Sequence, residues 1–161
     1  MSDAETRHVE IAGAPAQVWA FLWDADALAR VLPGCESLRA DGVGRYAAVL
    51  RYPTPFLTVR ADAAAELVDP VAPGSVLLVL DGRARGVGGG FHVRIPLTFE
   101  AAGDAGDRTR VGYSVDIAAT GAIASFGTGM LRDAIAGQVQ GLAADIEREI
   151  RAGRVPPPAG A

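Results

Sequence analysis

Apolar and polar residues alternate with a period of two through the middle of the chain, between Cys35 and Ala119. This period is typical of half-buried β-strands, in which successive side chains point to opposite faces of a sheet. Turn-forming pairs such as Asp41-Gly42 and Pro73-Gly74 separate the alternating segments. The pattern predicts six antiparallel strands, at residues 36–40, 45–52, 57–68, 75–85, 91–101 and 108–118. A weaker alternation predicts a first strand at residues 7–11.

The two ends of the chain have helical patterns instead. Pro15 suits the first position of a helix, and Val18 and Phe21 give it an apolar face, so two short helices are predicted after the first strand. Near the other end, apolar residues recur three or four positions apart from 121 to 151, which predicts one long amphipathic helix. Gly153 is expected to end this helix.

This order of elements predicts an α+β fold. A sheet with one apolar face needs a cover, and the C-terminal helix is the only large helix available. We therefore expect a curved antiparallel seven-stranded sheet wrapped around a long C-terminal helix, with two short helices after the first strand. The expected organisation is a single domain at residues 1–152, followed by a short proline-rich tail at residues 153–161.

Composition narrows the classes of partner. Half of the 161 residues are hydrophobic, which is enough for one core. The net charge is −4, and the 15 basic residues are all arginines without a dense block, so no nucleic acid is expected as a partner. No segment resembles a secretory signal or a membrane span, which predicts a cytoplasmic protein. The lone Cys35 has no second cysteine for a disulfide.

Strand alternation also predicts which side chains face the helix. One inward row contains several alanines, and protein interiors are close-packed, so these small side chains favour a hollow that an apolar guest would fill. Alternatively, bulky side chains opposite the sheet fill the space. The predicted cavity lining comprises Trp19, Tyr46, Leu50, Tyr52, Val59, Ala61, Ala63, Phe91, Val93, Ile95, Tyr113, Val115, Phe126 and Met130. Residues 52–56 and 86–90, rich in proline and glycine, are expected to form its rims.

Candidate catalytic and metal-binding groups are few. The chain has no G-x-S-x-G motif, and its two histidines, His8 and His92, have no carboxylate at metal-ligand spacing, so no metal and no cofactor are expected. His92 is predicted to face outward. Leu77 and Val79 are predicted to place apolar surface on the outer face, where they would meet a partner or a second copy, or be covered by the chain itself. Both a monomer and a homodimer remain open.

Two motifs carry a resemblance to known proteins. Ala14-Pro15 and Val18-Trp19 resemble the opening of the START/Bet v1-like (SRPBCC) superfamily, and the stretch VLPGCESL at residues 31–38 is similar to the G-subunit family of carbon monoxide dehydrogenase. The resemblance extends over residues 7–150 and implies a helix-grip fold. The chain departs from the family pattern at residues 86–100, which puts the cavity shape in doubt, and in its short C-terminal tail.

The resemblance also implies a function. Such a protein would bind a hydrophobic, quinone-like or lipid-like molecule and assist a molybdenum hydroxylase such as carbon monoxide dehydrogenase, which would hold the molybdenum cofactor. It would contact the inner face of the cell membrane peripherally. A competing interpretation is a cyclase, aromatase or dehydratase acting on a polyketide-like or aromatic substrate, with Tyr46, Tyr52 or Tyr113 as the acid. A third is an interaction module that uses Leu77 and Val79 and binds no ligand.

Overall fold

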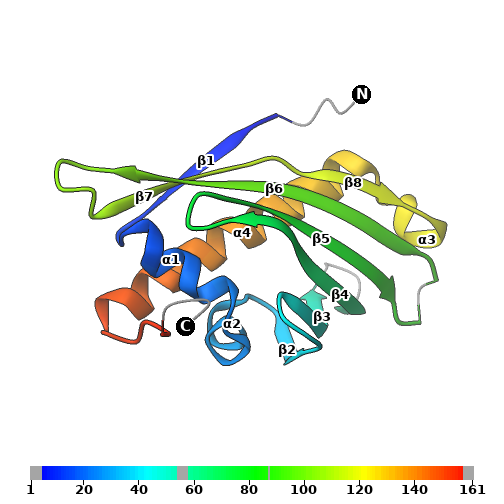
Figure 1. Ribbon diagram of the computed structural model, residues 1–161. Helices are drawn as coiled ribbons and strands as arrows, with labels where there is room; N and C mark the ends of the chain where they lie inside the picture. Colours follow the sequence, from blue (N-terminus) through cyan, green and yellow to red (C-terminus); the bar gives the residue numbers. More distant parts are fainter. Residues whose placement is uncertain (1–4, 54–57, 87, 158–161) are drawn as a thin grey trace.

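The computed structural model describes residues 5–53, 58–86 and 88–157, and it is α+β (Figure 1). One antiparallel sheet has the strand order β1-β7-β6-β5-β4-β3-β2, with β8 also paired to β6. The sheet curves around a long C-terminal helix without closing into a barrel, as the sequence predicts. The elements in chain order are β1 (Arg7–Ile11), α1 (Pro15–Leu22), α2 (Ala25–Val31), β2 (Cys35–Ala40), β3 (Arg45–Pro53), β4 (Thr58–Val71), β5 (Ser75–Ala84), β6 (Gly90–Ala102), β7 (Arg108–Tyr113), β8 (Asp116–Ala119), α3 (Gly121–Ala124) and α4 (Thr128–Arg151).

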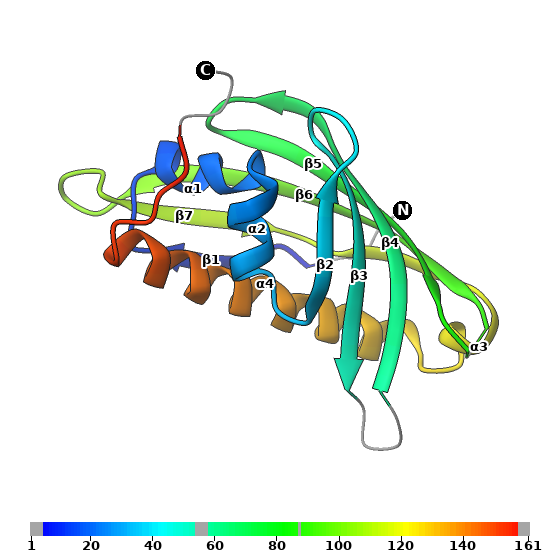
Figure 2. The same cartoon turned by 90° about the horizontal axis from the view of Figure 1, so that it is seen from below.

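The helices cover one side of the sheet. Helix α4 makes its main sheet contacts with β1 and β8, and it also packs against α1 and α2. Figure 2 shows α4 running beside β1 and β7, whereas β2, β3 and β4 lie farther across the sheet. Within the described residues, no helix combines the length and the apolar character that crossing a membrane requires.

The last predicted strand is interrupted, which corrects the expectation of one strand over residues 108–118. Its two parts, β7 and β8, both pair with β6, and the pairs Leu97↔Tyr113 and Arg94↔Asp116 belong to one continuous register. Pro96 lies in β6 opposite the break. Because proline has no backbone N–H to donate, it interrupts a hydrogen-bonded ladder without shifting the register.

The predicted helix over residues 121–151 is also interrupted. The short helix α3 ends at Ala124, and α4 begins at Thr128. Gly127 between them has φ of 87° and ψ of 139°, a conformation outside the helical region that glycine adopts readily. The predicted end of the helix is confirmed. Gly153 has φ of 76°, and the N–H of Arg154 donates to the carbonyl of Glu149 at 2.9 Å, which closes a Schellman motif.

The stretch Leu32-Pro33-Gly34 turns the chain from α2 into β2 and fastens three elements together. Gly34 has φ of +72°, and a Cβ there would lie 2.4 Å from the carbonyl oxygen of Arg51 in β3. On the other side, a Cβ at Gly141 of α4 would lie 3.0 Å from Cγ of Pro33. The glycines therefore permit close backbone approach, and this motif has a structural role.

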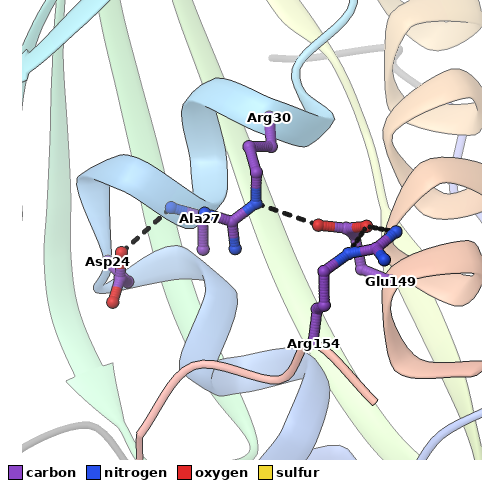
Figure 3. Close-up of polar contacts among 5 residues, drawn as sticks. All are labelled: Asp24, Ala27, Arg30, Glu149 and Arg154. Atoms are coloured by element: carbon purple, nitrogen blue, oxygen red, sulfur yellow. Dashed lines mark hydrogen bonds and ion pairs between the residues drawn. The ribbon is translucent and has the colours of Figure 1, made fainter. Parts of the chain in front are cut away.

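An ion cluster holds the C-terminal end of α4 (Figure 3). The carboxylate of Glu149 accepts from Arg30 Nε of α2 at 2.9 Å and from Arg154 Nε at 2.8 Å. Glu149 is only 8% exposed. The hydrogen bond from Arg154, and then that from Arg30, hold the pKa of this carboxyl below its usual value. The Asp24 side chain caps α2 beside the cluster by accepting from the N–H of Ala27 at 2.9 Å.

Candidate functional site

The inner face of the sheet, which faces α4, is closed at one end and partly open at the other. At the closed end, beside α1, the rings of Trp19 and Phe99 meet edge to face with centroids 5.7 Å apart, and both residues are buried. Farther along the strands, inward-facing apolar side chains stay partly exposed. We call this region the open half, and it comprises Leu50, Val59, Leu80 and Phe91. It is open because α4 packs chiefly against β1 and β8.

The residues predicted to line one cavity are divided between these two ends. Phe91 and Phe99 lie eight residues apart in β6, which corresponds to about 26 Å, so Trp19 and Phe91 do not share a site. Tyr52 is 41% exposed, and Met130 is 54% exposed. Leu50, Val59, Phe91 and Phe126 are partly exposed. The buried members of the predicted lining are Trp19, Tyr46, Ala61, Ala63, Val93, Ile95, Tyr113 and Val115.

The three tyrosines differ in what their hydroxyls do. The Tyr46 hydroxyl donates to the carbonyl of Leu22 at 2.6 Å, and burial, followed by the nearby Asp24 charge, raises the pKa of Tyr46. This hydroxyl ties β3 to α1 and is engaged by the fold. The Tyr113 hydroxyl is buried and has no hydrogen-bond partner within the described residues.

Gly82 of β5 is a site residue that sequence reasoning missed. It pairs with Phe91, and a Cβ at Gly82 would lie 2.1 Å from Cζ of the Phe91 ring. The ring therefore lies directly over Gly82 on the inner face, in the same row as Ala63. A glycine in the interior of a strand often marks a close approach, and this was the available signal. The Phe91 side chain is the cover that a ligand at this position would displace.

A cavity of about 1020 Å³ lies on the outer face of the same strands. We call it the outer trough. Outward-facing residues line it in two rows that cross β2, β3, β4, β5, β6 and β8 and end beside β8. One row is Arg39, Ala47, Ala64, Asp81, His92 and Ala118. The other row is Ser37, Val49, Asp62, Arg83, Gly90 and Thr120.

The charged groups of the outer trough are partly paired. Asp81 Oδ1 lies 2.6 Å from Nδ1 of His92, and Asp62 accepts two hydrogen bonds from Arg85 at 2.6 and 2.9 Å. The Arg85 hydrogen bond lowers the pKa of Asp62. Arg39 and Arg83 form no ion pair within the described residues.

The other sequence predictions are resolved as follows. His92 faces outward, and His8 is exposed too. No group of three metal-ligating side chains occurs in the described part of the chain. Burial is the main cause that raises the pKa of the Cys35 thiol, which disfavours the reactive thiolate. Leu77 and Val79 are half-buried. Residues 54–57 of one predicted rim and residue 87 of the other lie outside the described residues.

Several solved structures share this fold. A conserved protein from Geobacillus kaustophilus is 24% identical with a TM-score of 0.81, and the match covers 92% of this chain and 95% of that one. A START superfamily protein from Mycobacterium smegmatis is 11% identical with a TM-score of 0.65, covering 92% and 97%. The Zhui aromatase/cyclase from Streptomyces sp. R1128 is 17% identical with a TM-score of 0.62, covering 93% and 96%. These similarities show the START-like fold.

Sequence comparison gives the family. No curated protein matches the chain. The family model for CoxG, the G-subunit of carbon monoxide dehydrogenase, matches residues 8–151, which includes both helices of the N-terminal region, the whole sheet and α4. The chain therefore belongs to the CoxG family of carbon monoxide dehydrogenase.

Proposed function

We propose that this protein binds a hydrophobic small molecule, quinone-like or lipid-like, against the open half of its inner face. The observation that carries the proposal is the partial exposure of Leu50, Val59, Leu80 and Phe91, although all four face inward. A ligand that covered these side chains would remove apolar surface from water, which favours binding by about 25 cal/mol for each Å². Family membership supports the same conclusion.

Small residues give such a ligand room next to the backbone. Ala61 and Ala63 of β4 and Gly82 of β5 lie side by side on the inner face. The Phe91 ring now covers Gly82, and a rotation about its side-chain bonds would expose this strip to a flat ring or an acyl chain. Apolar walls with few polar groups are usual for binding sites of this class.

The proposed biological role is that of an accessory protein to a molybdenum hydroxylase such as carbon monoxide dehydrogenase, which would hold the molybdenum cofactor. The family description supports this role. The proposal places the protein in the cytoplasm beside the inner face of the cell membrane, where apolar electron carriers reside. We do not adopt the cyclase alternative, because Tyr46 is engaged with Leu22 and Tyr52 is largely solvent-exposed.

Organic extraction of the purified protein, followed by mass spectrometry, tests whether an apolar molecule accompanies it. Titration calorimetry with a decyl-substituted benzoquinone then locates the site. Leu80→Glu places a charge in the open half, and its desolvation cost should weaken binding at least about tenfold. Val79→Glu is the matched control, since Val79 is a partly exposed neighbour on the opposite face of β5.

The proposal fails if neither extraction nor titration detects an apolar ligand, or if Val79→Glu weakens binding as much as Leu80→Glu. Circular dichroism of each variant checks that the fold is retained. The accessory role has its own test: quinone reduction by reduced carbon monoxide dehydrogenase should be faster with the wild-type chain than with Leu80→Glu. Equal rates would contradict that role and leave ligand binding to be judged by the titration.

A further inference from the structure

The outer trough is not used by the proposed ligand site, because its lining residues point away from α4. Adjacent residues of one strand face opposite sides, so Ala64 lines the trough while Ala63 and Ala65 belong to the inner face. We propose that the outer trough is a docking groove for an amphipathic helix of a partner protein, and that this helix carries acidic side chains.

The floor of the trough suits close packing against another element. Its central positions are occupied by Ala47, Ala64 and Ala118, and Gly90 continues the second row. These residues lie on four different strands, and the pairings Ala47↔Ala64 and His92↔Ala118 fix their alignment. Small side chains along a floor let a partner's backbone approach the sheet and let its larger side chains fill the space.

The dimensions of the trough match a helix better than a small molecule. It crosses six strands, and five strand spacings of about 4.8 Å give a length of about 24 Å. A helix of about 16 residues has that length. The two rows lie two residues apart along each strand, about 7 Å, which is wide enough for the line of side chains along one face of a helix.

The charges of the trough select an acidic partner. Asp62 and Asp81 are occupied by Arg85 and His92, whereas Arg39 and Arg83 have no ion-pair partner within the described residues. Arg39 and Arg83 belong to different rows, so they lie on opposite walls. They are three strands apart, about 14 Å along the trough, which equals two to three helical turns. Carboxylates at that spacing would pair with both arginines.

The test uses the full chain and a displayed library of 16-residue helical peptides randomised on one face. Selected peptides should carry Asp or Glu two to three turns apart, beside small and apolar residues. Ala64→Trp fills the floor at an exposed outer position and should weaken their binding at least tenfold, as should Arg39→Glu combined with Arg83→Glu. Thr98→Trp and Arg94→Glu are matched controls on the same face, outside the trough, and should leave affinity within twofold.

Three outcomes would overturn the proposal. The library could return no helical binder, or it could return peptides enriched in lysine and arginine. Selected peptides could also bind Ala64→Trp as well as they bind the wild-type chain. Sedimentation without peptide supplies a further check, because a dimer that Ala64→Trp disperses would show that a second copy of this chain, rather than a partner helix, covers the trough.

Discussion

Individual side chains show which polar groups are committed to the fold. Glu149 is the most constrained carboxylate among those described here, because arginines from α2 and from the segment after α4 both donate to it. Tyr46 is similarly engaged through Leu22, whereas the Tyr113 hydroxyl is enclosed without a partner in the described residues. A buried hydroxyl that lacks a hydrogen bond costs stability. These contrasts make opposite predictions for conservative substitutions.

The Glu149 cluster should make stability depend on pH. Its pKa is lowered in the folded protein, so its contribution is present above the carboxyl pKa of the unfolded chain and is lost as the pH falls through the lower folded value. Glu149→Gln should therefore lower Tm by several degrees at pH 7, and the difference from wild type should vanish below about pH 4. Thermal melts across this range measure it.

Asp133→Asn is the control for this change, because the Asp133 side chain is 74% exposed in its pair with Arg7. Exposed pairs contribute little to stability. A Tm difference for Glu149→Gln that stays constant from pH 7 to pH 3 would contradict the assigned role of the carboxylate.

Removing each buried tyrosine hydroxyl should have a different effect on the free energy of unfolding. Tyr46→Phe leaves a buried carbonyl without its donor and should destabilise the protein by about 1–3 kcal/mol. Tyr113→Phe removes a hydroxyl with no partner in the described residues and should be neutral or stabilising. Urea unfolding of both variants decides the matter, and equal losses would show that the Tyr113 hydroxyl is bonded.

At the scale of elements, the alternation of apolar residues was sufficient to predict seven strands and the two short helices. It failed where the pattern continued through a backbone interruption. Period two runs past Ser114, and only the pairing with β6 places Pro96 opposite that point. Helical spacing likewise continues through Gly127, although its backbone leaves the helical region. The outer trough could not be predicted, because it depends on the register of six strands.

The turn after α2 gives a prediction at this scale. Gly34→Ala would force a Cβ against the Arg51 carbonyl at a φ of +72°, so it should destabilise the protein by about 2 kcal/mol or more. Gly137→Ala is the matched control, since Gly137 lies within α4 and an added Cβ would meet nothing within 4 Å. Alanine there should stabilise by about 0.5–1 kcal/mol. Denaturant midpoints compare the two, and similar values would show that the turn tolerates a side chain.

For the whole molecule, the sheet separates two proposed surfaces by the thickness of one backbone. The open half and the outer trough share β3, β4, β5 and β6, yet they use alternate residues of these strands. Gly82 is the place where they come closest, since it lies between the trough rows and beneath the Phe91 ring. Two partners could therefore occupy one sheet at the same time.

This geometry predicts that the two kinds of binding are separable. Ala64→Trp should abolish binding of the acidic helix and leave quinone affinity within twofold, because its side chain points away from α4. Leu80→Glu should do the reverse. Titrations of both variants with both probes give four affinities for comparison with wild type. If either substitution weakened both affinities tenfold while circular dichroism showed an intact fold, the two faces would be coupled through the sheet, and the assignment of separate sites would be wrong.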